Sequence, residues 1–278
     1  MRITDVGPGG FPQDPPRPDE HGALERALRS GRDAGRKLLV PYVTGGLGER
    51  WLDVVRSVAA AGADAIEVGI PFSDPVMDGP VIQEASTRAL ALGATPDTVL
   101  VDLANADAGV PLAVMTYYNL VHRSGHQRFA RSLADAGVAG AILPDLPVDE
   151  CGPWAAAADA AGVEMILLAA PTTPDDRAAR IVARSRGFVY GVGLMGVTGE
   201  RERLADSARQ LAARLKALTD VPVLIGVGVS TPTQAVLACE VADGVVVGSA
   251  LVRRLLEGGG PSEAARFVGE LRQALDAG

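Results

Sequence analysis

Short apolar runs bounded by glycine, proline or aspartate recur along the whole chain, separated by Ala-, Arg- and Leu-rich stretches with helical spacing. The runs span residues 38–43, 64–69, 111–116, 139–144, 163–169, 187–192, 221–226 and 244–248. Continuous apolar runs are typical of strands that are buried on both faces of a parallel sheet. Several helical stretches end at a glycine directly before the next run, where glycine allows a left-handed helix stop. These glycines are Gly62, Gly109, Gly137 and Gly162. The repeating unit is therefore a strand followed by a helix.

Eight strand–helix units fit a (β/α)8 TIM barrel better than an open doubly wound sheet. Because 47% of the residues are hydrophobic, the chain can form a large packed core, and we expect a single barrel domain over residues 22–278. Residues 1–21 contain five prolines, so we expect a disordered tail there. Chemistry in such barrels lies at the carboxyl ends of the strands.

The composition excludes several classes of function. The 26 Lys and Arg residues against 34 Asp and Glu residues give a net charge of −8, so no basic field gathers nucleic acid. No apolar run approaches the roughly 20 residues of a membrane span, and the first residues contain no apolar signal segment. Two cysteines leave no disulfide framework. We expect a cytoplasmic protein that holds any anion by local contacts.

The second apolar run carries an acidic residue. Strand alternation points Ala65, Glu67 and Gly69 into the barrel, and Ile66 and Val68 toward the helices. A carboxyl group in an apolar barrel loses hydration, which raises its pKa toward the range that is useful for proton transfer. Glu67 is therefore a candidate for acid–base catalysis, and a structural pairing with an Arg or Thr is the alternative.

The loop after this run, residues 70–80, is long for a strand-to-helix connection, and such loops are often functional. Its Asp78 fits a catalytic carboxylate and a turn or helix cap equally well. Glycines at the ends of the last two strands let backbone N–H groups approach a phosphate, although tight turns alone are the alternative. These glycine-rich ends are IGVGVS at 225–230 and VGSA at 247–250, and Gly199 after the sixth strand is a further candidate.

Other catalytic types lack the residues that they need. A Schiff-base aldolase needs a lysine in the barrel mouth, but Lys37 precedes the first strand and Lys216 lies on a polar helix face. His122 and His126 are better explained as a solvated pair than as metal ligands, and we predict no metal. The G-x-G-x-x-G match at 191–196 follows the sixth strand, whereas a dinucleotide site needs it after the first. Carboxylate acid–base chemistry on a small phosphorylated molecule remains.

The chain resembles the α subunit family of tryptophan synthase from about residue 24 to its end. The matching stretches are LVPYVT at 39–44, EVGIPFSDPVMDGP at 67–80, PDLP at 144–147, GVTG at 196–199 and GVG at 226–228. The 67–80 stretch is highly specific. That family is a (β/α)8 barrel that cleaves indole-3-glycerol phosphate to indole and glyceraldehyde 3-phosphate without a cofactor.

The resemblance implies roles for individual residues. The family's general acid–base glutamate falls on Glu67, its aspartate that holds the indole N–H falls on Asp78, and a tyrosine lining its site falls on Tyr190. We group these three as catalytic. The family's phosphate site falls on Gly199, Gly228, Gly248 and Ser249, and its indole pocket falls on Tyr42, Met115, Ile142 and Thr198. Ordinary barrel packing is the alternative for each pocket residue.

The resemblance also implies a partner, the pyridoxal-phosphate-dependent β subunit of tryptophan synthase, in an α2β2 assembly. Two departures leave the partner open: Gly45–Gly48 replaces the family's usual acidic turn, and Leu194-Met195 lacks the arginine often found there. A stand-alone indole-3-glycerol-phosphate lyase that releases indole is therefore an alternative. A non-catalytic member that binds the phosphate and only activates a partner is another.

Overall fold

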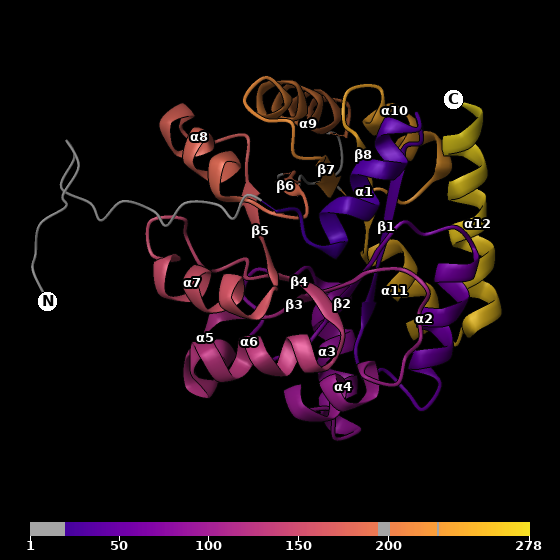
Figure 1. Ribbon diagram of the computed structural model, residues 1–278. Helices are drawn as coiled ribbons and strands as arrows, with labels where there is room; N and C mark the ends of the chain where they lie inside the picture. Colours follow the sequence, from indigo (N-terminus) through magenta and orange to yellow (C-terminus); the bar gives the residue numbers. More distant parts are fainter. Residues whose placement is uncertain (1–19, 194–200, 227) are drawn as a thin grey trace, which may run out of the picture.

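The eight expected strands form one closed parallel barrel, so the predicted (β/α)8 fold is confirmed (Figure 1). The computed structural model describes residues 20–193, 201–226 and 228–278, without the side chains of residues 201–206. Each strand pairs with its neighbours in sequence, and β8 pairs with β1 to close the barrel. The strands are β1 (Leu38–Thr44), β2 (Ile66–Gly69), β3 (Leu112–Met115), β4 (Val138–Ile142), β5 (Glu164–Ala169), β6 (Val189–Val192), β7 (Val223–Gly226) and β8 (Gly244–Val247).

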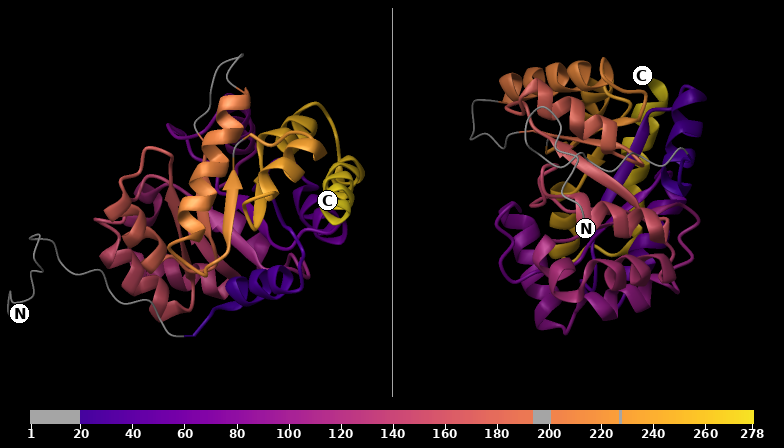
Figure 2. Two further views of the ribbon diagram at one scale, coloured as in Figure 1. Left: turned by 90° about the horizontal axis from the view of Figure 1, so that it is seen from above. Right: turned by 60° about the vertical axis from the view of Figure 1, so that its left-hand side comes forward.

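Helices surround the strands on the outside of the barrel (Figure 2). Two of the predicted helix stops, Gly137 and Gly162, have φ angles of 71° and 73°, the left-handed conformation that glycine adopts without strain. The next strand begins one residue after Gly137 and two residues after Gly162, close to where the sequence predicts it. In the described residues the helices are α1 (Ala23–Asp33), α2 (Trp51–Ala60), α3 (Pro80–Ala91), α4 (Pro96–Leu103), α5 (Tyr118–Ser124), α6 (His126–Asp135), α7 (Gly152–Ala161), α8 (Asp175–Arg184), α9 (Arg201–Lys216), α10 (Pro232–Cys239), α11 (Ser249–Leu256) and α12 (Pro261–Ala277).

Side chains of β2 alternate between the two sides of the barrel wall, as predicted. Ala65, just before the strand, belongs to a buried cluster inside the barrel that also contains Phe188 and Leu224. Ile66 and Val68 instead belong to the larger apolar layer between the strands and the helices. Glu67 lies between Ile66 and Val68, so its side chain points into the barrel.

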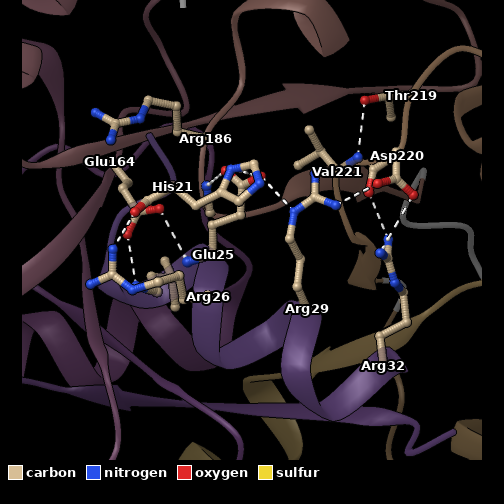
Figure 3. Close-up of polar contacts among 12 residues, drawn as sticks. His21, Glu25, Arg26, Arg29, Arg32, Glu164, Arg186, Thr219, Asp220 and Val221 are labelled. Carbon is tan, nitrogen blue, oxygen red and sulfur yellow. Dashed lines mark hydrogen bonds and ion pairs between the residues drawn. The ribbon is translucent and has the colours of Figure 1, made fainter. Parts of the chain in front are cut away.

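Helix α1 closes the amino-terminal end of the barrel. Its Leu24 and Leu28 are fully buried in the cluster inside the barrel. At the start of β5, the Glu164 carboxylate accepts hydrogen bonds from the backbone N–H groups of Leu24 (2.7 Å) and Glu25 (3.1 Å), which caps the helix (Figure 3). The open mouth for a ligand therefore lies at the other end, where the strands have their carboxyl ends.

Two expectations concern the rest of the chain. Residues 1–19 of the expected tail lie outside the described residues, so the tail stays a prediction. Within the described ranges, no helix has both the length and the apolar character needed to cross a bilayer.

Candidate active site

Glu67 is buried at the mouth of the barrel. It pairs in register with Tyr42 of β1 and Ala113 of β3, and its exposed fraction is 1%. Its Oε2 atom has no hydrogen-bond partner, and no ion pair to it is found, among the described residues. Burial, assisted by the nearby charge of Asp78, raises the pKa of Glu67 to about 8. At neutral pH the side chain is therefore an uncharged acid, ready to give up a proton.

Two tyrosines from β1 and β6 enclose the same space. A Cβ atom built on Gly69 would lie 1.8 Å from the Tyr42 hydroxyl, and one on Gly226 would lie 2.7 Å from the Tyr190 hydroxyl. Only glycine therefore leaves room for these two hydroxyl groups. Burial raises the pKa of both tyrosines, and the nearby charge of Glu67 adds to the effect. Both side chains stay neutral hydrogen-bonding groups over the whole working range of pH.

Asp78 lies on the loop between β2 and α3, close to Glu67. Its Oδ2 atom accepts a hydrogen bond from the Tyr117 hydroxyl at 3.1 Å, and its backbone oxygen accepts one from Gln83 Nε2 at 2.9 Å. Burial raises the pKa of Asp78, while the Tyr117 hydrogen bond acts in the opposite direction. The two carboxyl groups therefore have different surroundings: Glu67 has an oxygen without a partner, and Asp78 has a donor that favours its charged form.

Met115 and Ile142 lie at the carboxyl ends of adjacent strands, with Met115 paired to Ile142 in the ladder. Ile142 is fully buried in the cluster inside the barrel, together with Tyr190. Met115 packs partly buried against this cluster and against the one that contains Tyr42. The structure thus brings three of the four predicted pocket residues to the same mouth, and Thr198 lies outside the described residues.

The predicted phosphate residues lie at the ends of β7 and β8. Helix α11 begins at Ser249, with Gly248 as its N-cap and no side-chain cap, so its first N–H groups are available to an anion. A Cβ on Gly248 would lie 3.5 Å from the Tyr42 Cβ, which places this helix start beside Tyr42, the residue that pairs with Glu67 in the ladder. Gly228 has a φ of 66°, and no described atom lies within 4 Å of a Cβ built on it. Gly199 lies outside the described residues.

Both lysines of the chain lie at the opposite end of the barrel. Lys37 Nζ is 3.5 Å from the backbone oxygen of Ala242, and Lys216 Nζ is 2.6 Å from Asp243 Oδ1. Neither side chain lies at the mouth that holds Glu67, in keeping with the expectation that no lysine forms a Schiff base there.

His122 and His126 lie outside the barrel mouth, on α5 and α6. The ring centroids of His122 and His126 are 6.1 Å apart, and His126 Nε2 is 3.0 Å from the Tyr118 hydroxyl. Within the described ranges, no group of three or more His, Cys, Asp or Glu side chains is placed to hold a metal ion.

Tyr117 is the site residue that the sequence reasoning missed. It follows Met115 and Thr116 at the carboxyl end of β3, which is the position where barrel enzymes carry functional groups. That position could have singled it out. Its contact with Asp78 could not have been predicted, because the two residues come from different strand–helix units.

Comparisons with known proteins identify the family. The model of the tryptophan synthase alpha chain family matches residues 28–274. The tryptophan synthase alpha chain of Thermobifida fusca is 44% identical over 261 residues, covering 92% of this chain and 97% of that protein. The alpha chain of Streptomyces coelicolor is 43% identical, covering 91% of this chain and 94% of that protein.

Solved structures agree with this assignment. A chain of Mycobacterium tuberculosis tryptophan synthase superposes with a TM-score of 0.86 at 40% identity, covering 93% of this chain and 100% of that one. The tryptophan synthase subunit alpha of Legionella pneumophila gives a TM-score of 0.84 at 30% identity, with 93% and 100% coverage. The fold, the neighbouring carboxyl groups of Glu67 and Asp78, and these similarities lead to one conclusion. The chain belongs to the tryptophan synthase alpha chain family.

Proposed function

We propose that the chain cleaves indole-3-glycerol phosphate to indole and glyceraldehyde 3-phosphate, as the α subunit of tryptophan synthase in tryptophan biosynthesis. One observation carries this proposal: a buried Glu67 with a pKa of about 8, whose Oε2 atom has no hydrogen-bond partner among the described residues, lies beside Asp78 at the mouth of the barrel. The reaction is a retro-aldol cleavage, and it belongs to the carbon–carbon lyases.

Glu67 moves the protons. In its neutral form it donates a proton to C3 of the indole ring, which leaves positive charge on the ring nitrogen. The bond between C3 and the glycerol chain then breaks, and its electron pair restores the aromatic ring. The hydroxyl on the departing carbon loses its proton to the Glu67 carboxylate and becomes the aldehyde of glyceraldehyde 3-phosphate. Glu67 thus ends in the protonated form in which it began.

Asp78 and the glycine-rich strand ends hold the two ends of the substrate. The Asp78 carboxylate accepts a hydrogen bond from the indole N–H and stabilises the positive charge that develops on the ring nitrogen. The phosphate binds to backbone N–H groups at Gly228, Gly248 and Ser249, with Gly199 as the fourth proposed contact. Tyr190 and the proposed pocket of Tyr42, Met115, Ile142 and Thr198 enclose the ring. The substrate ring itself accepts the electrons, so the proposed steps use no cofactor.

We also propose that the pyridoxal-phosphate-dependent β subunit binds next to the site and receives the indole. The loop that carries Asp78 exposes two large apolar residues, Val76 (80% exposed) and Met77 (58% exposed). Exposed apolar side chains on a functional loop are typical of a protein contact. Their position directly before Asp78 would let a partner act on the catalytic loop.

The test is indole release from indole-3-glycerol phosphate by the purified chain, alone and with added β subunit. We expect slow release by the chain alone, faster release in the mixture, and a fall of about 10²–10⁴-fold with Glu67→Gln in either case. Equally fast release with and without the partner would favour the stand-alone lyase. No release in either arm, with faster turnover by the partner, would show a non-catalytic activator and contradict the proposal.

A further inference from the structure

Tyr117 contacts the catalytic loop near both of its ends. Its side chain is 5% exposed, and it is the N-cap residue of α5, at the carboxyl end of β3. Its ring stacks on Phe72, with centroids 5.0 Å apart and an interplanar angle of 28°. Its hydroxyl accepts a hydrogen bond from the Met77 backbone N–H at 2.9 Å and donates one to Asp78 Oδ2 at 3.1 Å. One side chain therefore connects the beginning and the end of the loop to a neighbouring strand–helix unit.

After Ile70, the backbone hydrogen bonds within this loop are local among the described residues. Val76 N–H donates to the Asp74 oxygen at 2.9 Å, and Asp78 N–H donates to the Pro75 oxygen at 3.0 Å. These bonds shape turns but do not fix where the turns lie relative to the barrel. The loop is also fastened where it begins, because Ile70 N–H donates to the Met115 oxygen at 2.9 Å. Near Asp78, Tyr117 is the described side chain from another unit that hydrogen-bonds to the loop.

We infer that Tyr117 is a positioning residue for the proposed reaction, which orients the Asp78 carboxylate at the barrel mouth. The Met77 N–H occupies a lone pair of the Tyr117 oxygen, so the single hydroxyl proton is directed to Asp78. A hydrogen bond to one carboxylate oxygen fixes the plane of the carboxylate, and a charge-assisted bond of this kind is stronger than one between neutral groups. This inference rests on the proposed function only for the kinetic part of its test.

The groups around Asp78 determine how the Tyr117 hydroxyl affects the pKa of the Asp78 carboxyl group. Asp78 faces Glu67 on β2, Tyr42 on β1 and Tyr190 on β6, besides Tyr117. Burial raises the pKa of Asp78, and the Tyr117 hydrogen bond lowers it. Burial also raises the pKa of Tyr117 itself, so its hydroxyl keeps its proton and stays a donor at working pH. Removing the hydroxyl should therefore raise the pKa of Asp78.

The kinetic test compares two neighbouring tyrosines. Tyr117→Phe removes the hydroxyl and keeps the ring stack on Phe72, whereas Tyr118→Phe removes a hydroxyl that contacts His126 on the outside of the barrel. We expect Tyr117→Phe to lower kcat about tenfold, the usual size for losing a hydrogen bond to a charged group, with little change in KM. Because the pKa of Asp78 should be higher in Tyr117→Phe, activity of this variant should begin to fall at a higher pH on the acid side. Tyr118→Phe should leave the rate unchanged.

A direct titration tests the same contact without any turnover. The pKa of the Asp78 carboxyl is measured by carbon-13 NMR in the wild type, in Tyr117→Phe and in Tyr118→Phe, with Asp78→Asn identifying the signal. A higher pKa of Asp78 in Tyr117→Phe alone, with unchanged unfolding midpoints in both variants, supports the inference. An unchanged pKa of Asp78, or an equal change in Tyr118→Phe, overturns it. If the wild type does not cleave indole-3-glycerol phosphate, the proposed function fails, and this titration still decides the role of Tyr117.

Discussion

Two buried glutamates at opposite ends of the barrel differ in what surrounds them. Glu164, at the amino-terminal end, is fully buried and accepts hydrogen bonds from the backbone of Leu24 and Glu25. Glu67, at the carboxyl end, is just as buried but has an oxygen without a partner in the described part of the chain. Burial raises the pKa of both carboxyl groups, but at Glu164 the two backbone hydrogen bonds act in the opposite direction. A buried carboxylate with such bonds can stabilise the fold, whereas one without them is costlier to ionise and is suited to moving protons.

The rest of the amino-terminal end follows the pattern of Glu164. Asp64 contacts Arg36 at 2.7 Å and Arg272 at 3.3 Å. Asp243 contacts Lys216 at 2.6 Å and also accepts a hydrogen bond from the Val223 backbone at 2.8 Å. These acids connect strands to helices, and strands to neighbouring strands. The comparison therefore separates a structural end of the barrel from a chemical one.

The largest effect is expected at the chemical end. Glu67→Gln keeps the shape of the side chain but cannot donate and accept the proton in turn, so cleavage should fall by about 10²–10⁴-fold, the usual contribution of acid–base catalysis. Binding of a non-cleavable indole alkyl phosphate should be retained, which calorimetry can check. Unchanged turnover would remove Glu67 from the mechanism.

The same substitution should change how stability depends on pH. Glu67 has a pKa of about 8 in the folded chain against an ordinary value of 4.5. Below about pH 4.5 both states are protonated, and between that value and about 8 the unfolded chain ionises while the folded chain holds its proton. The wild type therefore loses stability over this window relative to Glu67→Gln, by up to roughly 5 kcal/mol. Denaturant unfolding at several pH values measures it, with the exposed Glu150→Gln as a control for net charge.

The structural end should respond in the opposite way. Glu164→Ala removes the acceptor for two backbone N–H groups of α1, whose N-cap Gly22 offers no side-chain bond. We expect a loss of roughly 2–3 kcal/mol in the free energy of unfolding. Glu164→Gln keeps an oxygen acceptor and should lose less. Cleavage per folded molecule should be unaffected, and a folded Glu164→Ala protein without activity would break the distinction between the two ends.

The smallest effect is expected at the proposed phosphate site. Gly228→Ala adds a methyl group where φ is 66° and no described atom lies within 4 Å. We expect KM to rise several-fold with little change in kcat, because alanine in this conformation costs about 1 kcal/mol and disturbs the N–H groups. Gly258→Ala is the matched control, since Gly258 has a φ of 96°, also faces open space, and lies after the far end of α11. An equal rise in KM for both variants would argue against a phosphate contact at Gly228.

The barrel and the inward Glu67 could be predicted because both follow from local patterns. Continuous apolar runs indicate buried strands, and a period of two places Glu67 on the same side as Ala65. The helix ends at Gly137 and Gly162 could be predicted for the same reason, because glycine adopts the left-handed conformation that ends a helix.

The remaining features depend on contacts between distant parts of the chain. In the sequence, Glu164 is only a polar residue within the apolar run at 163–169, and its role as a cap depends on α1, about 140 residues earlier. Tyr117 reaches Asp78 across 39 residues. The space that Gly69 leaves for the Tyr42 hydroxyl is a further case, because strand pairing alone brings them together. No local pattern encodes such contacts.

The pKa of Glu67 tests the comparison between the two ends most directly. It can be measured from the pH dependence of the difference infrared or carbon-13 NMR signal between the wild type and Glu67→Gln. The burial of Glu67 and the nearby charge of Asp78 predict a value of about 8. An ordinary value near 4.5 would show that Glu67 is charged at neutral pH, and that it is not the acid that protonates the indole ring.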